Sequence, residues 1–168
     1  FVENVSMLAA KAIQDWPLYS GQEASTRYMD FSTAAFENPL GTAEGEAIQE
    51  RWREFYVDAM PDVQEHLRQK YPLQKGEDEL VYRRAIAAKS FDIMRAFLPA
   101  GAHTNLSWTT NLRQASDKLS WLKSHPDDSV KALARGIEAA LCAKYPHSFK
   151  AERPEISEYK SLSMSDDY

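Results

Sequence analysis

Cysteine is almost absent from this sequence. A single residue, Cys142, excludes an intramolecular disulfide and any metal site built from several cysteines. Cys142 lies in the apolar stretch Ala-Ala-Leu-Cys-Ala, where a cysteine ordinarily packs as a small hydrophobic side chain. Because disulfide-poor chains suit reducing compartments, we expect a cytoplasmic protein.

Long apolar runs, basic clusters and metal-binding spacings are also missing. No run approaches the roughly 18 residues that cross a membrane, and no signal peptide is visible. The net charge of −5, without any Lys/Arg run, argues against binding to a nucleic-acid polymer. The histidines show no ligand spacing, and there is no glycine-rich phosphate loop. These absences leave a small anionic ligand possible, because a few local arginines suffice to bind it.

The bulk composition is that of a globular chain. Its 168 residues, 43% of them hydrophobic, suit one domain with a real core. We expect that domain to span residues 1–149 and a polar tail to follow at 150–168. The chain begins at Phe1 inside a predicted helix, so we expect it to lack an upstream part.

Helical periodicity dominates the chain. We expect Pro61 to kink or split the second of the predicted helices, and we expect the third, which is alanine-rich, to be buried on several sides. Thr109 and Thr110 are the expected caps of the fourth helix, which carries Leu112 and Leu122 on its inner face. The other predicted helices span residues 2–16, 43–71, 78–97 and 127–144.

Only two strands are predicted, over residues 26–31 and 103–108. Helices therefore outnumber strands, and the pattern predicts an α+β fold (mixed α/β, helix-dominated).

The most informative stretch is Ser20-Gly-Gln-Glu-Ala-Ser-Thr-Arg-Tyr28. If residues 23–27 are extended, Glu23, Ser25 and Arg27 project from one face, because strand side chains alternate. A carboxylate, a hydroxyl and a guanidinium on one face suit a phosphorylated ligand. The alternative interpretation is a solvated strand face with a Glu–Arg pair.

Two later segments, Arg95-Ala-Phe-Leu-Pro99 and Trp108-Thr-Thr-Asn-Leu-Arg113, accompany this stretch. In this order, the three resemble the flavin-dependent thymidylate synthases. That family carries Arg-His-Arg-x-x-Ser-x-Asn-Glu-x-Ser-x-Arg-Tyr, then Arg-x-x-Leu-Pro and Trp-Thr-x-Asn-x-Arg. The resemblance covers roughly residues 10 to 149.

The resemblance implies a fold like that of thymidylate synthase-complementing proteins and the reductive methylation of dUMP, or a related pyrimidine nucleotide, to dTMP. It also implies FAD as cofactor, NADPH and methylenetetrahydrofolate as co-substrates, and a homotetramer with sites shared between subunits. The other class of thymidylate synthase needs a cysteine nucleophile. The only cysteine of this chain, Cys142, is expected to be a packed hydrophobic side chain, which agrees with the flavin-dependent class.

The same resemblance assigns site residues. The implied nucleotide contacts are Glu23, Ala24, Ser25, Thr26, Arg27 and Arg95. The implied FAD contacts are Ser20, Glu23, Asn111, Arg113 and Asp117. No residue is a convincing covalent nucleophile, so no catalytic residue is assigned, and no metal is expected.

Three departures from the family pattern stand beside these matches. The range 15–17, Asp-Trp-Pro, occupies the Arg-His-Arg positions and contains no cation. Leu122 occupies the position of a nucleotide-activating arginine, with Lys123 beside it as a candidate substitute, and Asp117 replaces an asparagine. These departures keep two alternatives open: a catalytically silent nucleotide-binding or structural homologue that acts with a companion module, and a helical interaction module with chance matches.

Overall fold

Five α-helices, three β-strands and two short 3₁₀ turns make up the part of the chain that the computed structural model describes, residues 1–149. The helix-dominated α+β class is therefore confirmed. The polar tail predicted at 150–168 lies outside the described residues. The chain divides into two compact units, one formed by residues 1–24 and the chain from Thr104 onward, the other by residues 25–103.

A small sheet organises the first unit. Its strand order is β1 (Val2–Ser6), β3 (His103–Trp108), β2 (Gly21–Glu23), so the central strand comes last in sequence. β2 runs antiparallel to β3. The two backbones approach so closely at Gly21 that a Cβ there would lie 2.0 Å from the Ser107 carbonyl oxygen. Glycine is therefore required at this position.

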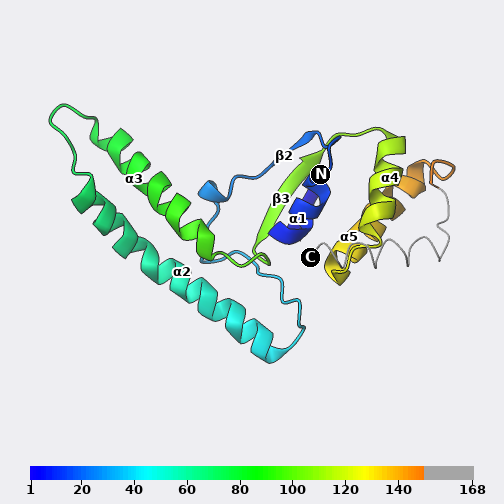
Figure 1. The fold of residues 1–168 in the computed structure, drawn as a ribbon, viewed down its shortest axis with the longest axis horizontal. Helices are drawn as coiled ribbons and strands as arrows, with labels where there is room; N and C mark the ends of the chain where they lie inside the picture. The colour runs from blue at the N-terminus through cyan, green and yellow to red at the C-terminus, as the bar shows by residue number, and fades with distance from the viewer. Residues whose placement is uncertain (150–168) are drawn as a thin grey trace. The chain divides into compact units, whose positions relative to one another are not determined.

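Three helices enclose the core of the first unit: α1 (Met7–Gln14), α4 (Leu112–Leu122) and α5 (Asp128–Lys144). In Figure 1, α4 and α5 lie side by side. α1 contacts both of them. The shared core is rich in alanine, which lets the helices approach closely, and comprises Ala9, Ala10, Ala12, Ile13, Leu106, Leu119, Leu122, Val130 and Ala134.

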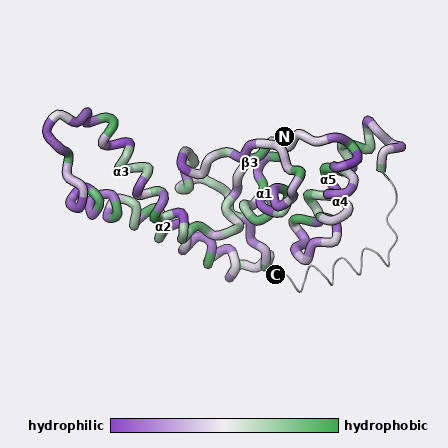
Figure 2. The backbone as a smooth tube through the Cα atoms, turned by 45° about the horizontal axis from the view of Figure 1, so that its top comes forward, coloured by the Kyte–Doolittle hydropathy of each residue, from purple (hydrophilic) through white to green (hydrophobic). Residues whose placement is uncertain are grey.

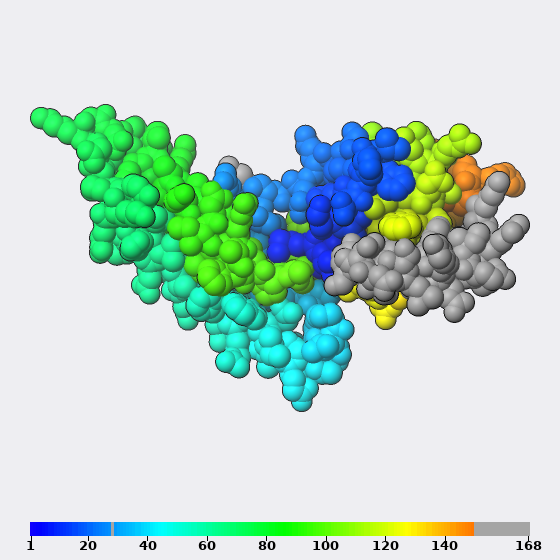
Figure 3. Space-filling model, viewed as in Figure 1, coloured from blue at the N-terminus to red at the C-terminus, as the bar shows by residue number. Residues whose placement is uncertain are grey.

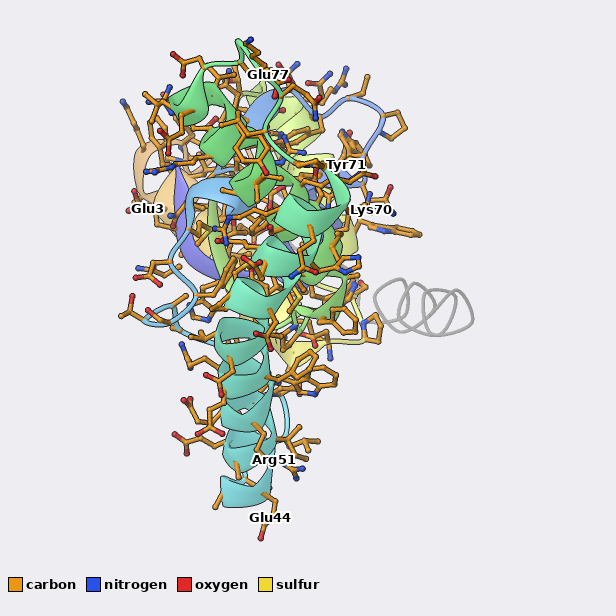
Figure 4. The ribbon with its side chains drawn as sticks, turned by 90° about the vertical axis from the view of Figure 1, so that its left-hand side faces the viewer. Glu3, Glu44, Arg51, Lys70, Tyr71 and Glu77 are labelled. Carbon is orange, nitrogen blue, oxygen red and sulfur yellow. The ribbon has the colours of Figure 1, made fainter. Side chains whose placement is uncertain are left out.

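The second unit is built around a helical hairpin. α3 (Glu79–Met94) packs against the C-terminal part of the longer α2 (Ala43–Lys70) (Figures 1 and 3). In Figure 4, Glu44 marks the start of α2 and Lys70 its end. The acidic first turn and basic last turn of α2 both complement the helix dipole. Two 3₁₀ turns complete the unit, η1 (Thr26–Tyr28) and η2 (Arg95–Phe97).

Several predicted elements differ from the structure. The N-terminal helix begins at Met7, capped by Ser6, and the residues before it form β1. The valines of β1 are three residues apart, which suits a helical period, and pairing with β3 overrides that local pattern. Pro61 does not split α2, which runs through it. Asn111, rather than Thr109 or Thr110, caps α4.

The expectation that the alanine-rich third helix is central is wrong for this chain. Within α3, the buried residues are Ile86, Ser90, Phe91 and Met94. Leu80 and Val81 are exposed. Figure 2 shows hydrophobic and hydrophilic residues interleaved along α2 and α3. Only one side of α3 finds a partner in its own unit, because the hairpin has two layers.

Candidate functional site

Ser25 begins a tight turn and does not continue a strand. Its hydroxyl oxygen accepts a hydrogen bond from the Arg27 backbone N–H at 3.4 Å and caps η1, which starts at Thr26. Serine side chains compete for backbone donors in this way and so favour turns over strands. The predicted strand over 26–31, and the single extended face of residues 23–27, are therefore both wrong.

Arg27 is held by a carboxylate that lies 65 residues further along the chain, on α3. Its Nε donates to Asp92 Oδ1 at 3.0 Å, and its Nη2 donates to the same oxygen at 2.6 Å and to Oδ2. The pair is partly exposed, with 44% of the Arg27 side chain accessible. This fork geometry fixes the plane of the guanidinium at the surface of the second unit.

Arg95 lies within electrostatic reach of the same carboxylate. The hydrogen bond from Arg27 is the main cause that lowers the pKa of Asp92; burial opposes it, and the charges of Arg27, Arg95 and Lys89 each lower the pKa by less. The charges of both predicted nucleotide arginines therefore act on Asp92, and Arg27 also contacts it directly. The ion pair of Asp92 is formed with Arg27.

Glu23 and Ala24 belong to the first unit, whereas Ser25, Thr26 and Arg27 belong to the second. The Ala24 N–H donates to the Asn105 carbonyl at 2.8 Å, which extends the β2–β3 pairing by one residue. Glu23 accepts a hydrogen bond from the Gln14 side chain at 2.8 Å and is exposed.

Ser20 and Asn111 both lie near the junction between β3 and α4. The Ser20 carbonyl accepts the Thr109 N–H at 2.7 Å, two residues before Asn111. The Asn111 side-chain oxygen accepts the Gln114 N–H at 2.9 Å and thereby caps α4. The asparagine predicted to contact flavin thus has a structural role, with its side-chain oxygen engaged.

Arg113 and Asp117 lie one turn apart on α4, and both are exposed. Side chains four residues apart share one face of a helix. Arg113 adds its charge to the positive end of the α4 dipole, which favours an anionic group, while Asp117 opposes it. The charges at the start of α4 therefore favour a single anionic group beside Arg113, and Asp117 disfavours a second one.

The segment 15–17, which lacks the family's cations, packs against a lysine from α4. Lys118 Nζ donates to the Asp15 carbonyl at 3.0 Å and lies 5.3 Å from the centre of the Trp16 ring. Lys118 is only 2% exposed, and burial lowers its pKa to about 8, with Asp15 raising and Lys11 lowering it. A cation is thus present beside this segment, but it faces the core.

Sequence reasoning missed Lys118, although a signal existed. It stands three residues after Ala115 and four before Leu122, both on the inner stripe of α4. A lysine at such a position is buried unless its helix rotates, so its amine needs an internal acceptor.

Neither Leu122 nor Lys123 presents a surface cation at the position where the family has its activating arginine. Leu122 is 1% exposed and belongs to the core of the first unit. Lys123 binds both carboxylate oxygens of Glu138 on α5, at 2.8 and 3.0 Å. The lysine considered as a substitute is therefore already engaged in joining two helices.

Two further observations on residues 1–149 concern metal binding and membrane-crossing helices. No three histidine, cysteine or acidic side chains in this part of the chain are grouped so that they could hold a metal ion. No helix within it is long and apolar enough to cross a membrane.

The fold is that of a helix-dominated α+β protein, and Arg27 pairs with Asp92 on the surface of its second unit. A family model, thymidylate synthase complementing protein, matches residues 1–147, so the chain belongs to that family. A comparison with curated proteins gives no match. Membership supports a thymidylate synthase-like function in general, in a family that is generally FAD-dependent.

Proposed function

We propose that this chain is a thymidylate synthase-like protein that binds dUMP or a related pyrimidine nucleotide and takes part in its reductive methylation to dTMP. The observation that carries the proposal is the cluster of Arg27 and Arg95 around Asp92, in a chain of this family. Two arginines near one surface point provide paired donors and charge for a phosphate.

In this proposal, Ser25 and Arg27 hold the nucleotide phosphate with the backbone of Ala24 and Thr26, and Arg95 adds a second guanidinium. Glu23 lies near the base. The protein orients the nucleotide, and no side chain acts as a covalent nucleophile.

The residues fit a flavin in part. Asn111, Arg113 and Asp117 at α4, with Ser20 and Glu23, would hold one end of FAD, and Arg113 supplies the cation. When bound, FAD supplies hydride chemistry, with NADPH as its reductant and methylenetetrahydrofolate as the one-carbon donor. The range 15–17 does not fit, because it has no cation and the Trp16 indole N–H is buried without a hydrogen-bond partner in the described part of the chain.

We also propose a homo-oligomer, a tetramer or a pairing with a companion half. Exposed large apolar side chains gather on the helical hairpin and support this proposal. They include Ile48, Trp52, Phe55, Leu80, Val81 and Ile93.

The second candidate is a catalytically silent homologue that keeps the nucleotide site. Two observations favour it: residues 15 and 16 pack on Lys118, and Leu122 is buried where the family has an arginine. Such a protein would bind dUMP without binding flavin.

The test is a pair of calorimetric and fluorescence titrations of the purified chain, one with dUMP and one with FAD. Arg27→Ala should weaken dUMP binding at least tenfold, because a two-pronged charged contact is lost. The control is Arg83→Ala, which removes an exposed arginine of α3 that pairs with Glu79 within its own helix.

Binding of both ligands, followed by dTMP formation when NADPH and methylenetetrahydrofolate are added, supports the synthase. Binding of dUMP alone supports the silent homologue. If dUMP does not bind, or if Arg83→Ala weakens it as much as Arg27→Ala, the nucleotide site proposed here is wrong.

A further inference from the structure

A pocket in the unit of residues 25–103 shares no residue with the proposed nucleotide and flavin sites. Its volume is about 400 Å³, within the range of small-molecule sites. Two elements, α2 and η2, supply its lining. We name it the Trp52 pocket; it is lined by Ile48, Arg51, Trp52, Phe55 and Phe97.

The Trp52 pocket lies on the part of α2 that α3 does not cover. α2 has 28 residues and α3 has 16, so the two helices of the hairpin differ in length. In Figure 1, the starting half of α2 extends beyond α3. Arg51, labelled in Figure 4, lies toward the Glu44 end of α2. η2 directly follows α3 and reaches this part of α2 through Phe97.

Three aromatic rings form the apolar wall of the pocket. Trp52 and Phe55 meet edge to face with ring centres 5.8 Å apart, and Phe55 and Phe97 do so at 5.5 Å. Because each ring is held by its neighbour, the wall is preformed, and a ligand need not order it on binding. Aromatic rings also pair with one another in defined geometries, which favours a flat ring over a flexible alkyl chain.

These rings expose a large apolar area to water. The exposed fraction is 43% for Trp52, 45% for Phe55 and 43% for Phe97, and Ile48 beside them is 50% exposed. A contiguous apolar patch on a protein surface commonly marks a binding site. A ligand ring that covers the patch removes apolar area from water, and that burial supplies affinity.

Arg51 is the charged group of the pocket. Its side chain is exposed, and it has no hydrogen bond or ion pair with any other residue of the range 1–149. Arg53, two residues later, differs: its guanidinium binds Glu50 and the Phe31 carbonyl. The N–H donors of Arg51 are therefore open to an acidic group on a ligand that lies against the rings.

Two carboxylates near Arg51 limit the charge of that ligand. Glu44 precedes Arg51 by seven residues and Glu54 follows it by three, so all three lie on one side of α2. A monoanion is attracted by Arg51 with little opposing cost, whereas a dianion is repelled by both glutamates. The Trp52 pocket therefore favours a carboxylate over a phosphate.

We propose that the Trp52 pocket binds a small aromatic monocarboxylate. The aromatic ring of the ligand lies on Trp52 and Phe97, and its carboxylate accepts hydrogen bonds from Arg51. Burial of the ring supplies most of the affinity, and the guanidinium selects the acid. This ligand carries no phosphate, and its site is separate from Arg27, so the inference goes beyond the proposed function.

Fluorine NMR of the tryptophans is the test. Of the four tryptophans, Trp52 lies in the unit of residues 25–103, and Trp16, Trp108 and Trp121 lie in the first unit. The full chain, labelled with 5-fluorotryptophan, is titrated with 2-naphthoate, and Trp52→Phe assigns the signal. The Trp52 signal should shift and saturate, while the other three stay in place.

Two analogues of the probe separate the contribution of the acid from that of the ring. 2-Naphthamide has the same ring without the charge and should bind about fivefold more weakly, as loss of an exposed charged contact does. 2-Naphthyl phosphate adds a second negative charge and should bind no more tightly than 2-naphthoate, because Glu44 and Glu54 repel it.

Two variants and a matched control make the result specific. Arg51→Gln should remove the preference for 2-naphthoate over 2-naphthamide. Phe97→Ala should weaken both probes roughly tenfold, because one wall is lost; Phe97 is 43% exposed, so circular dichroism should report an unchanged helix content. The control, Arg84→Gln, removes an exposed arginine of α3 outside the pocket and should change neither affinity.

Three results would overturn the proposal: a Trp52 signal that does not move, equal affinities of the parent chain for 2-naphthoate and 2-naphthamide, or an equal loss in Arg84→Gln. Ile48, Trp52 and Phe55 also support the proposed oligomer. An unmoved Trp52 signal in a chain that light scattering shows to be oligomeric would therefore assign the pocket to a second copy of the chain.

A parallel titration with dUMP separates this pocket from the proposed nucleotide site. The affinity for 2-naphthoate should be the same with dUMP present and in Arg27→Ala, and a loss in either case would overturn the proposal by making the pocket part of the nucleotide site. If 2-naphthoate binds and dUMP does not, the pocket stands and the nucleotide site falls. If dUMP binds and Trp52 does not respond to 2-naphthoate, the pocket falls alone.

Discussion

The two units of this chain solve the burial of apolar surface differently. The first encloses an alanine-rich core with a sheet and three helices, and it even buries the charged Lys118. The second is a hairpin of two long helices whose outer faces expose large apolar side chains such as Trp52 and Leu80. The first unit therefore completes its own core, whereas the second leaves large apolar side chains exposed.

The largest expected effect breaks the core of the first unit. Leu119→Ala should lower the free energy of unfolding by about 3 kcal/mol, because Leu119 is fully buried and the cavity has little room to collapse. Leu80→Ala, on α3, removes the same atoms from a side chain that is 58% exposed and should cost less than about 0.5 kcal/mol.

Urea unfolding followed by circular dichroism measures both variants. If Leu119→Ala and Leu80→Ala lowered the free energy of unfolding equally, the outer face of α3 would be covered in solution, and the contrast between the two units would not hold. Light scattering on the same samples would then report the oligomer.

The next effect concerns the buried lysine. The pKa of Lys118 lies near 8 in the folded state against 10.5 when unfolded, chiefly through burial. Between these values, the unfolded chain binds more protons, so stability should rise from about pH 8 to pH 10.5, by at most ~3 kcal/mol. Lys118→Met should abolish that rise and leave stability at pH 7 equal or higher.

Unfolding curves at pH 7 and pH 10 test this, with the exposed Lys144→Met as control. A rise of the same size in Lys118→Met would assign the pH dependence to other groups. A large loss of stability at pH 7 would show instead that the hydrogen bond to the Asp15 carbonyl outweighs the cost of burial.

The smallest effect is expected in the second unit. Asp92→Asn breaks the pair with Arg27, yet both partners are partly exposed, and pairs of this kind contribute about 0–1 kcal/mol. The melting temperature should therefore stay within roughly 2 °C of the parent. A larger drop would show that Asp92 holds the hairpin together and does not merely orient Arg27.

Much of the architecture could be predicted from local signals. Apolar periodicity located α2, α3 and α5 to within one or two residues at each end, apart from the 3₁₀ turn that ends the third predicted helix. The strand over residues 103–108 was also predicted correctly, and its central place in the sheet follows from pairings that no local pattern encodes. Local preference decides helices well, since their hydrogen bonds close within four residues.

Non-local contacts account for what could not be predicted. β1 is a strand because it lies beside β3, where the Asn4 N–H donates to Asn105 Oδ1 across 101 residues. The candidate site has the same character: its residue types could be named, but the pairing of Arg27 with Asp92 depends on how α3 folds back. Ser25 shows the opposite error, where a local cap overrode an assumed strand.

The carboxylate of Asp92 makes anion binding at Arg27 an exchange. An incoming ligand must compete with an acceptor that is tethered in place and present at a high effective concentration. Chloride or a simple carboxylate offers no more than the carboxylate it would displace, whereas a phosphate dianion offers a greater charge and three acceptor oxygens. In the proposed site, the ion pair would thus act as a threshold: monoanions such as chloride would not displace Asp92 from the guanidinium, whereas phosphorylated compounds would have the advantage.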